Sequence, residues 1–351
     1  MQRTPIAFAS LFLLAALPAQ RDGGPGGGQP RSPRLPELKN FTAEVGPITS
    51  KTVREGEAGY TILLPKGYAD EANKDTKYPW VLWLSGFGGS NEFLDRGGVG
   101  VLDRLRGEDK IPAMAFVIFR GPGRRTTYMN GEQRSDTEDL LTGDFVTQVQ
   151  TKYRLATEPK HRALMGISAG GFGAMKIALR HPDLFGVVAT HSAAIMPADP
   201  TELEGMAEAT VQRLLRAGLA KEFGDPIDKT KWAAHMPMAI VAAKKPEELK
   251  GMQIYFDAGT DDNYGLCPPN EQLSKVMTAA GHKHLFRKVE GGGHAFGSDS
   301  MLDNVAVSLQ FDGAAFAGKD AVAVMTAAME KPAEAPKVQA AKDAPKQDAG
   351  K

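Results

Sequence analysis

The sequence has 351 residues, enough for one large domain or two small ones with a sizeable core. Lysine plus arginine and aspartate plus glutamate both number 42, so nothing in the charge balance favours a nucleic acid or an anionic membrane as a partner. Cys267 is the only cysteine, which excludes an intrachain disulfide.

The chain begins with the pattern of a secretory signal peptide. Arg3 precedes the short apolar stretch PIAFASLFLLAALPAQ, which ends in small residues. A bilayer-spanning helix needs about 20 apolar residues, and this stretch is shorter. We therefore predict a signal peptide over 1–19, cleaved after Ala19, and an exported protein, periplasmic or secreted, with no stable membrane insertion.

The composition changes again at both ends of the remaining chain. Residues 20–40 are rich in glycine and proline and are predicted to form a flexible linker. Residues 319–351 are rich in alanine, lysine and proline, and we expect a disordered tail there. A single folded domain is thus expected over 41–318.

Short, nearly continuous apolar runs alternate with helix-like segments in this domain. Helical spacing appears at 136–154, where Asp136 is positioned as a cap, at 169–181, and at 268–281, which begins with two prolines. Such alternation is typical of an α/β fold with a central, mostly parallel sheet flanked by helices. The apolar runs predict strands at 61–65, 79–86, 114–119, 162–168, 186–193, 252–259 and 284–290.

The stretch ALMGISAGGFGAMKIAL, residues 163–179, places Ser168 between Gly166 and Gly170 where a predicted strand meets a predicted helix. Small residues at a tight turn are one explanation. The other is a G-x-S-x-G nucleophile elbow, a sharp turn that holds the serine hydroxyl above the sheet. The strand before and the helix after favour the elbow, so we predict that Ser168 is a nucleophile.

A serine nucleophile needs a base, and the chain has seven histidines. His294 follows three glycines directly after a predicted strand, at the sheet edge where catalytic groups gather in α/β folds, and it is the predicted base. His191 also ends a strand and either lines the site or packs in the core. His282 and His284 resemble a metal-binding pair but lack a third ligand at suitable spacing.

The remaining parts of such a site are an acid and an oxyanion hole. The segment IYFDAGTDDNYG offers Asp257, Asp261 and Asp262 just beyond a strand, and spacing alone does not choose among them. Two backbone N–H groups are expected to hold the oxyanion, those of Ala169 and of Phe87 in the loop LSGFGGS. That loop lacks the Lys-Ser/Thr ending of a phosphate-binding P-loop.

These segments together resemble the esterase D-like group of α/β-hydrolases, which includes feruloyl and acetyl-xylan esterases, S-formylglutathione hydrolases and mycolyltransferases. The serine segment and the G-T-x-D…G-G-G-H pair are the specific parts and are similar to those of the feruloyl-esterase-like branch. The resemblance implies the α/β-hydrolase fold, and its G-T-x-D pattern implies that Asp262 is the acid. It covers YPWVLWLSGFGGS, LLTGDFVTQVQTKYR, HRALMGISAGGFGAMKIALRHPDLFG, FGDPIDKTKWAAHMP, IYFDAGTDDNYG and EGGGHAFG.

Two further expectations come from this resemblance. Ser85-Gly86 stands where the family often has His-Gly, so the hydrogen bonds behind the oxyanion loop are expected to differ from the usual ones. The long connection 196–250 is implied to form the wall of an acyl pocket. Trp232 and Met236 in it either line that pocket or belong to the core.

The sequence therefore predicts an exported serine carboxylic-ester hydrolase that acts through Ser168, His294 and Asp262 and an acyl-enzyme. The expected substrates are small-molecule or saccharide esters, such as feruloyl or acetyl esters, and no metal, organic cofactor or nucleic acid is expected. Two alternatives stay open. One is an acyltransferase on the same fold that passes the acyl group to a sugar hydroxyl, and the other is a non-catalytic binding protein.

Overall fold

The computed structural model describes residues 37–89, 91–123, 126–131, 134–205, 222–224 and 226–330. The predicted signal peptide, most of the predicted linker and the last 21 residues of the predicted tail, 331–351, lie outside these ranges. None of the helices within these ranges is long and apolar enough to cross a membrane.

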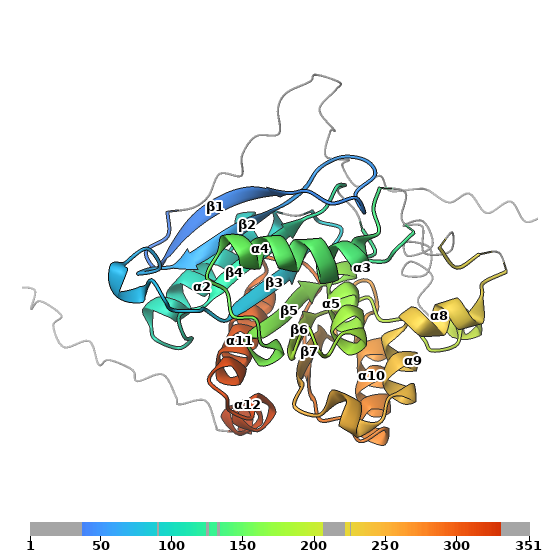
Figure 1. The fold of residues 1–351 in the computed structure, drawn as a ribbon. Helices are drawn as coiled ribbons and strands as arrows, with labels where there is room; N and C mark the ends of the chain where they lie inside the picture. Colours follow the sequence, from blue (N-terminus) through green and yellow to red (C-terminus); the bar gives the residue numbers. More distant parts are fainter. Residues whose placement is uncertain are drawn as a thin grey trace, which may run out of the picture. The chain divides into compact units, whose positions relative to one another are not determined.

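The fold is built on an eight-stranded sheet with the order β1-β2-β4-β3-β5-β6-β7-β8 (Figure 1). Strands β3 to β8 are parallel, while β2 runs antiparallel to both β1 and β4. The prediction of a central, mostly parallel sheet is confirmed. The strands are β1 (Phe41–Ile48), β2 (Ala58–Pro65), β3 (Trp80–Leu84), β4 (Ala115–Arg120), β5 (Arg162–Ile167), β6 (Val187–His191), β7 (Gln253–Gly259) and β8 (Leu285–Val289).

Every predicted strand is present, and β1 is the one that the sequence analysis missed. Its sequence FTAEVGPI contains a glycine and a proline and is only partly buried, so it has no continuous apolar run. Pairing with β2 from Phe41↔Pro65 to Ile48↔Ala58 stabilises it as the edge strand of the sheet. Edge positions tolerate proline because one side of the strand donates no ladder hydrogen bonds.

Helices cover both faces of the sheet because side chains alternate along each strand. In β3, Trp80, Leu82 and Leu84 face one core, and Val81 and Trp83 face the other. The first core is covered by α3 (Thr137–Leu140), a π-helical turn (Leu141–Phe145), α4 (Val146–Lys152), α5 (Ala169–Arg180), α9 (Pro237–Ala243) and α10 (Cys267–Ala279). The second is covered by α1 (Glu92–Asp95), α2 (Gly98–Gly107), α11 (Asp299–Phe316) and α12 (Ala321–Glu330).

Smaller elements complete the described chain. They are η1 (Glu71–Asn73), η3 (Pro159–His161), η4 (Pro200–Gly205), α8 (Lys229–His235) and η5 (Pro246–Leu249). Helix α8 packs in a third apolar cluster, separate from the two cores.

The three predicted helices are present with two differences in detail. The segment 136–154 is divided into α3, the π-helical turn and α4. Asp136 is the N-cap residue of α3, as predicted, but its side chain makes no capping hydrogen bond to the helix. Its carboxylate instead accepts hydrogen bonds from the Gly131 N–H and the Arg54 guanidinium.

The predicted boundary of the disordered tail is also wrong. Residues 321–330 form α12, and Ala321, Val322 and Met325 are buried in the second core. The segment AVAVMTAAM contains enough apolar surface to pack, although the tail as a whole is rich in lysine, alanine and proline. The folded domain therefore continues beyond residue 318, at least to Glu330.

Candidate active site

Ser168 lies at the turn between β5 and α5 in an uncommon backbone conformation, with φ of 57° and ψ of −121°. Such a conformation costs about 1–3 kcal/mol and persists only where the surroundings enforce it. Here the Ser168 N–H donates to the His191 carbonyl at 3.0 Å. Gly170 passes so close to β3 that an added Cβ would lie 2.0 Å from the Leu84 carbonyl oxygen. The predicted strand–serine–helix elbow is therefore present, and Ser168 is half-buried between buried neighbours.

His294 and Asp262 meet in loops that follow β8 and β7. His294 Nδ1 and Asp262 Oδ2 are 2.8 Å apart, and the other carboxylate oxygen accepts the Tyr264 N–H at 2.8 Å. The Asp262 side chain is fully buried and that of His294 is 12% exposed. Asp261 is exposed, and its carboxylate accepts the neighbouring Thr260 hydroxyl at 3.3 Å. Of the three candidate aspartates, only Asp262 contacts His294.

Ser168 and His294 are not joined by a hydrogen bond in the described part of the chain. In unliganded enzymes this contact is often long and tightens only when substrate is bound. Glu92 lies near Ser168, on the other side of Gly86. An added Cβ on Gly86 would lie 3.2 Å from Ser168 Cβ and 3.5 Å from Glu92 Oε2. Burial raises the pKa of Glu92, while the Arg96 guanidinium, the Gly86 N–H and the His294 imidazole lower it, in decreasing order of influence.

Sequence reasoning did not single out Glu92. Its carboxylate is 8% exposed and lies against the glycine loop, since an added Cβ on Gly88 would be 2.5 Å from Oε1. Arg96 Nη1 lies 3.5 Å from the same oxygen. Nothing in the segment NEFLD distinguishes this glutamate from an exposed one on a short helix, so no local pattern reveals it.

The predicted oxyanion loop follows β3 directly. The Gly89 N–H donates to the Gly86 carbonyl at 3.3 Å, which closes a tight turn around Phe87. The Tyr128 hydroxyl donates to the Ser85 carbonyl at 2.6 Å. Ala169 is the first residue of α5, so its N–H is among those without an acceptor inside the helix.

His191 does not line the site. It is fully buried between the sheet and α11, with Nδ1 2.8 Å from Asp257 Oδ2 and Nε2 3.0 Å from Ser308 Oγ. The Tyr255 hydroxyl donates to the same Asp257 oxygen. Ser308, His191 and Asp257 thus form a second hydrogen-bonded Ser–His–Asp line, but none of the three has exposed surface. Ser308 is also within a helix and donates to the Val305 carbonyl, so no substrate reaches it.

Trp232 is likewise a packing residue. It is 1% exposed, its indole N–H donates to the Pro197 carbonyl, and its ring contacts Phe223 edge to face. Met236 is completely buried in the same cluster. Of the two readings for this pair, the structure supports core packing. The cluster consists of Met129, Phe172, Ala194, Met196, Phe223, Trp232 and Met236.

The other residues considered in the sequence also have structural partners. His282 Nε2 lies 3.0 Å from the Val241 carbonyl oxygen. His284 Nε2 bonds Ser274 Oγ at 2.8 Å, and its Nδ1 lies 2.9 Å from the His282 carbonyl oxygen. Burial raises the pKa of the Cys267 thiol, which disfavours the reactive thiolate.

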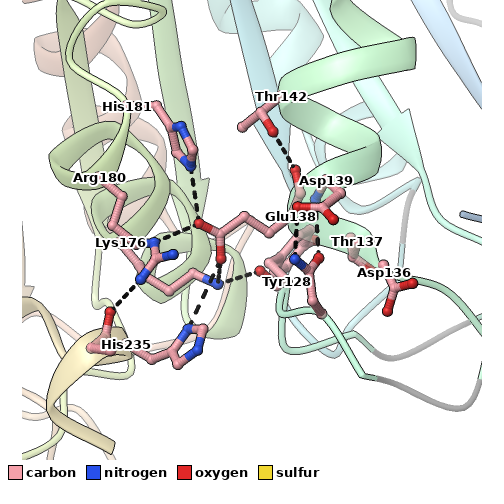
Figure 2. A network of polar contacts seen from close by, with 12 residues as sticks. Tyr128, Asp136, Thr137, Glu138, Asp139, Thr142, Lys176, Arg180, His181 and His235 are labelled. Atoms are coloured by element: carbon pink, nitrogen blue, oxygen red, sulfur yellow. Dashed lines mark hydrogen bonds and ion pairs between the residues drawn. The ribbon is translucent and has the colours of Figure 1, made fainter. Parts of the chain in front are cut away.

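A charge cluster centred on the buried Glu138 and Lys176 lies between α3 and α5 (Figure 2). Glu138 accepts Lys176 Nζ at 2.9 Å and Arg180 Nε at 2.7 Å, and His181 Nε2 lies 3.1 Å away. Its pKa lies well below the usual range because these partners outweigh the effect of burial, the largest single influence. His235 is 3.9 Å from the same carboxylate, and burial lowers its pKa to about 4. The cluster joins α3, α5 and α8.

The serine at a strand–helix turn, with a His–Asp pair on loops at the carboxyl edge of the same parallel sheet, defines an α/β-hydrolase. Comparisons with known proteins agree with this class. Residues 50–301 match the family described as "Putative esterase", and the chain belongs to that family. The predicted esterase D-like resemblance is confirmed.

Solved structures share the fold at low sequence identity. A ferulic acid esterase is 24% identical and superposes with a TM-score of 0.62 over 80% of this chain and 100% of that chain. The S-formylglutathione hydrolase of Agrobacterium tumefaciens is 17% identical, with a TM-score of 0.57 over 77% and 95% of the two chains. At these identities the likeness establishes the α/β-hydrolase fold.

A curated relative is an esterase of Mycobacterium tuberculosis strain H37Rv. It is 22% identical over 276 residues, which are 72% of this chain and 56% of the relative. The chain thus spans about half the length of the curated relatives it matches.

Proposed function

We propose that the chain is a serine carboxylic-ester hydrolase in which Ser168 attacks the ester carbonyl, His294 takes the serine proton and Asp262 orients His294. The observation that carries this proposal is the 2.8 Å bond between His294 Nδ1 and the buried Asp262, at the same sheet edge as the elbow. This bond leaves His294 Nε2 to accept the proton and stabilises the imidazolium that forms. The acyl group is carried on Ser168 until water, activated by His294, releases the acid.

The oxyanion of each tetrahedral intermediate would be held by the Ala169 and Phe87 N–H groups. Both lie on short segments fixed by backbone geometry, one at the start of α5 and one in the turn closed by Gly86 and Gly89. Donors fixed in advance favour the transition state because they need no reorganisation when the charge develops.

The proposed substrates are esters of aromatic or acetic acid with saccharides or small alcohols. The family match supports an ester substrate. Support for an aromatic acid comes from the 18% identical ferulic acid esterase of Anaeromyces mucronatus, whose structure in complex with ferulic acid shares the fold with a TM-score of 0.53. Export through the signal peptide at 1–19 belongs to the same proposal and fits an extracellular ester. N-terminal sequencing of the exported protein should begin at Gln20, and an intact Met1 would refute the cleavage.

Labelling with a fluorophosphonate and turnover of feruloyl, acetyl and longer-chain aryl esters test the proposal. Ser168→Ala should abolish labelling and lower turnover by about 10⁶-fold. The matched control is Ser308→Ala, the serine of the buried Ser–His–Asp line, which should keep both once the variant is shown to be folded. Labelling that survives Ser168→Ala would refute the nucleophile. A faster loss of ester when a sugar is added, with acyl-sugar as the product, would favour the acyltransferase.

A further inference from the structure

Tyr128 lies between β4 and α3 in a conformation that needs an explanation. Its φ is 57°, in the left-handed region that bulky residues rarely adopt, and it is 2% exposed. Holding a residue in this region costs about 1–3 kcal/mol. The conformation brings the phenol hydroxyl to the Ser85 carbonyl, where it donates at 2.6 Å.

Three contacts fix Tyr128 in this position. Its N–H donates to Thr126 Oγ1 at 2.9 Å, and its carbonyl accepts the Lys176 ammonium (Figure 2). Lys176 is itself fully buried and is held by Glu138. The tyrosine ring lies against Gly173 of α5, where an added Cβ would be 2.6 Å from the ring. The hydroxyl is therefore held in place by its own backbone and by the elbow helix.

The Ser85 carbonyl belongs to the peptide that leads from β3 into the loop with Phe87. The next peptide, between Gly86 and Phe87, is fixed by the Gly89 N–H on the Gly86 carbonyl. Gly86 joins these two peptides and is tightly packed, since an added Cβ would lie 3.2 Å from Ser168 Cβ and 3.3 Å from the Ile167 carbonyl oxygen. Among the residues that the structure describes, the buried Ser85 hydroxyl has no hydrogen-bond partner. Tyr128 restrains the carbonyl of the first peptide, and the Glu92 carboxylate lies beside the Gly86 N–H of the same peptide.

We infer that Tyr128 is a positioning residue for the oxyanion hole, an inference that rests on the proposed esterase function. Its hydroxyl sets the plane of the Ser85–Gly86 peptide and so the direction of the Phe87 N–H. The Glu138–Lys176 pair extends this restraint to the elbow helix. Because the oxyanion charge is absent from the bound ester and develops on the way to the tetrahedral intermediate, loss of the restraint lowers kcat and leaves KM largely unchanged.

The expected effect is smaller than that of removing an oxyanion donor. Loss of one donor lowers kcat by about 10²–10³-fold, whereas a donor that is retained but misdirected loses part of that. For Tyr128→Phe, which removes only the hydroxyl, we expect kcat to fall by about 10- to 100-fold, with KM within about threefold of the wild-type value.

The experiment compares wild type, Tyr128→Phe and the control Tyr153→Phe. Tyr153 is also buried, and its hydroxyl donates to Glu44 at 2.9 Å, outside the site. Each protein is assayed for kcat and KM on one aryl ester and for inhibition by an aryl boronic acid, which forms a tetrahedral adduct with a serine, and by the carboxylate product. Tyr128→Phe should lose boronate affinity by about the same factor as kcat and keep its product affinity. Tyr153→Phe should match wild type in all four.

Two outcomes overturn the inference. One is a Tyr128→Phe variant with wild-type kcat and boronate affinity. The other is a variant that loses boronate and product affinity equally, since that loss would be one of general binding. If wild type itself hydrolyses no ester and takes up no fluorophosphonate, the proposed function is wrong. An active wild type beside an equally active variant refutes only the role of Tyr128.

Discussion

Replacing Asp262 with asparagine should nearly abolish activity while leaving the shape of the site intact. The carboxylate accepts two hydrogen bonds, from His294 Nδ1 and from the Tyr264 N–H, each at 2.8 Å. An amide has one acceptor oxygen and one donor group, so only one of these bonds survives unchanged. With the oxygen toward Tyr264, the amide N–H₂ faces His294, whose Nδ1 must then accept. The ring proton moves to Nε2, and His294 no longer takes the serine proton.

The size of the effect follows from the opposite amide orientation. With the oxygen toward His294, the productive tautomer is kept, but the amide N–H₂ and the Tyr264 N–H face each other. Two buried donors are then unsatisfied, at about 1–3 kcal/mol each. The productive arrangement is disfavoured by about 2–6 kcal/mol, or about 30- to 10⁴-fold in rate. The equivalent change in a serine protease lowers kcat by about 10⁴-fold.

The assay is turnover of one aryl ester across the neutral and alkaline range, after circular dichroism shows that each variant is folded. Asp261→Asn is the matched control, because it removes the same charge from the adjacent residue, whose side chain is exposed. Its kcat should stay within about threefold of wild type. Asp257→Asn, in the buried line, should lower stability rather than turnover of the folded protein. Equal losses for Asp261→Asn and Asp262→Asn, or an Asp262→Asn variant with more than about a tenth of wild-type kcat, would refute the tautomer argument.

Four further predictions concern stability. Ser168→Gly should be more stable than Ser168→Ala by about 1 kcal/mol in the free energy of unfolding, because glycine adopts φ of 57° without strain. Equal denaturation midpoints for the two variants would contradict this. Glu138→Gln should lower the free energy of unfolding by about 3–5 kcal/mol in chemical denaturation, because it leaves the fully buried Lys176 without its carboxylate. The double variant with Lys176→Met should recover part of this stability, whereas additive losses would count against the pairing. Asp312 is fully buried and has no hydrogen-bond partner among the described residues, and its burial raises its pKa well above the usual value. The folded state therefore keeps a proton that the unfolded chain releases above about pH 4. The stability gain of Asp312→Asn over wild type should grow as pH rises from there, and a pH-independent difference would refute this. Truncation after Gly318 should lower the free energy of unfolding by about 2–4 kcal/mol because it removes the buried side chains of α12, whereas truncation after Glu330 should leave thermal stability nearly unchanged.

The local parts of this protein were predictable from sequence because short-range patterns encode them. The apolar runs at 61–65 and 114–119 form β2 and β4, and the glycines around Ser168 form the elbow. The position of His294 was predictable for the same reason, since a glycine-rich loop directly after a strand lies at the edge of the sheet. Each of these signals lies within about ten neighbouring residues, the range over which propensity and periodicity act.

Contacts between distant segments were decided by the tertiary structure alone. Asp262 was indistinguishable from Asp257 by spacing, and the choice depends on where the loop after β8 places His294. His191 follows Val187 and Ala189 in the alternation of β6, so it faces α11 and is covered by Ser308. Lys176 pairs with Glu138 from 38 residues away, and Tyr128 reaches Ser85 across 43. Such pairs exist because sheet order and helix packing bring the segments together, and the periodicity of either segment carries no information about the other.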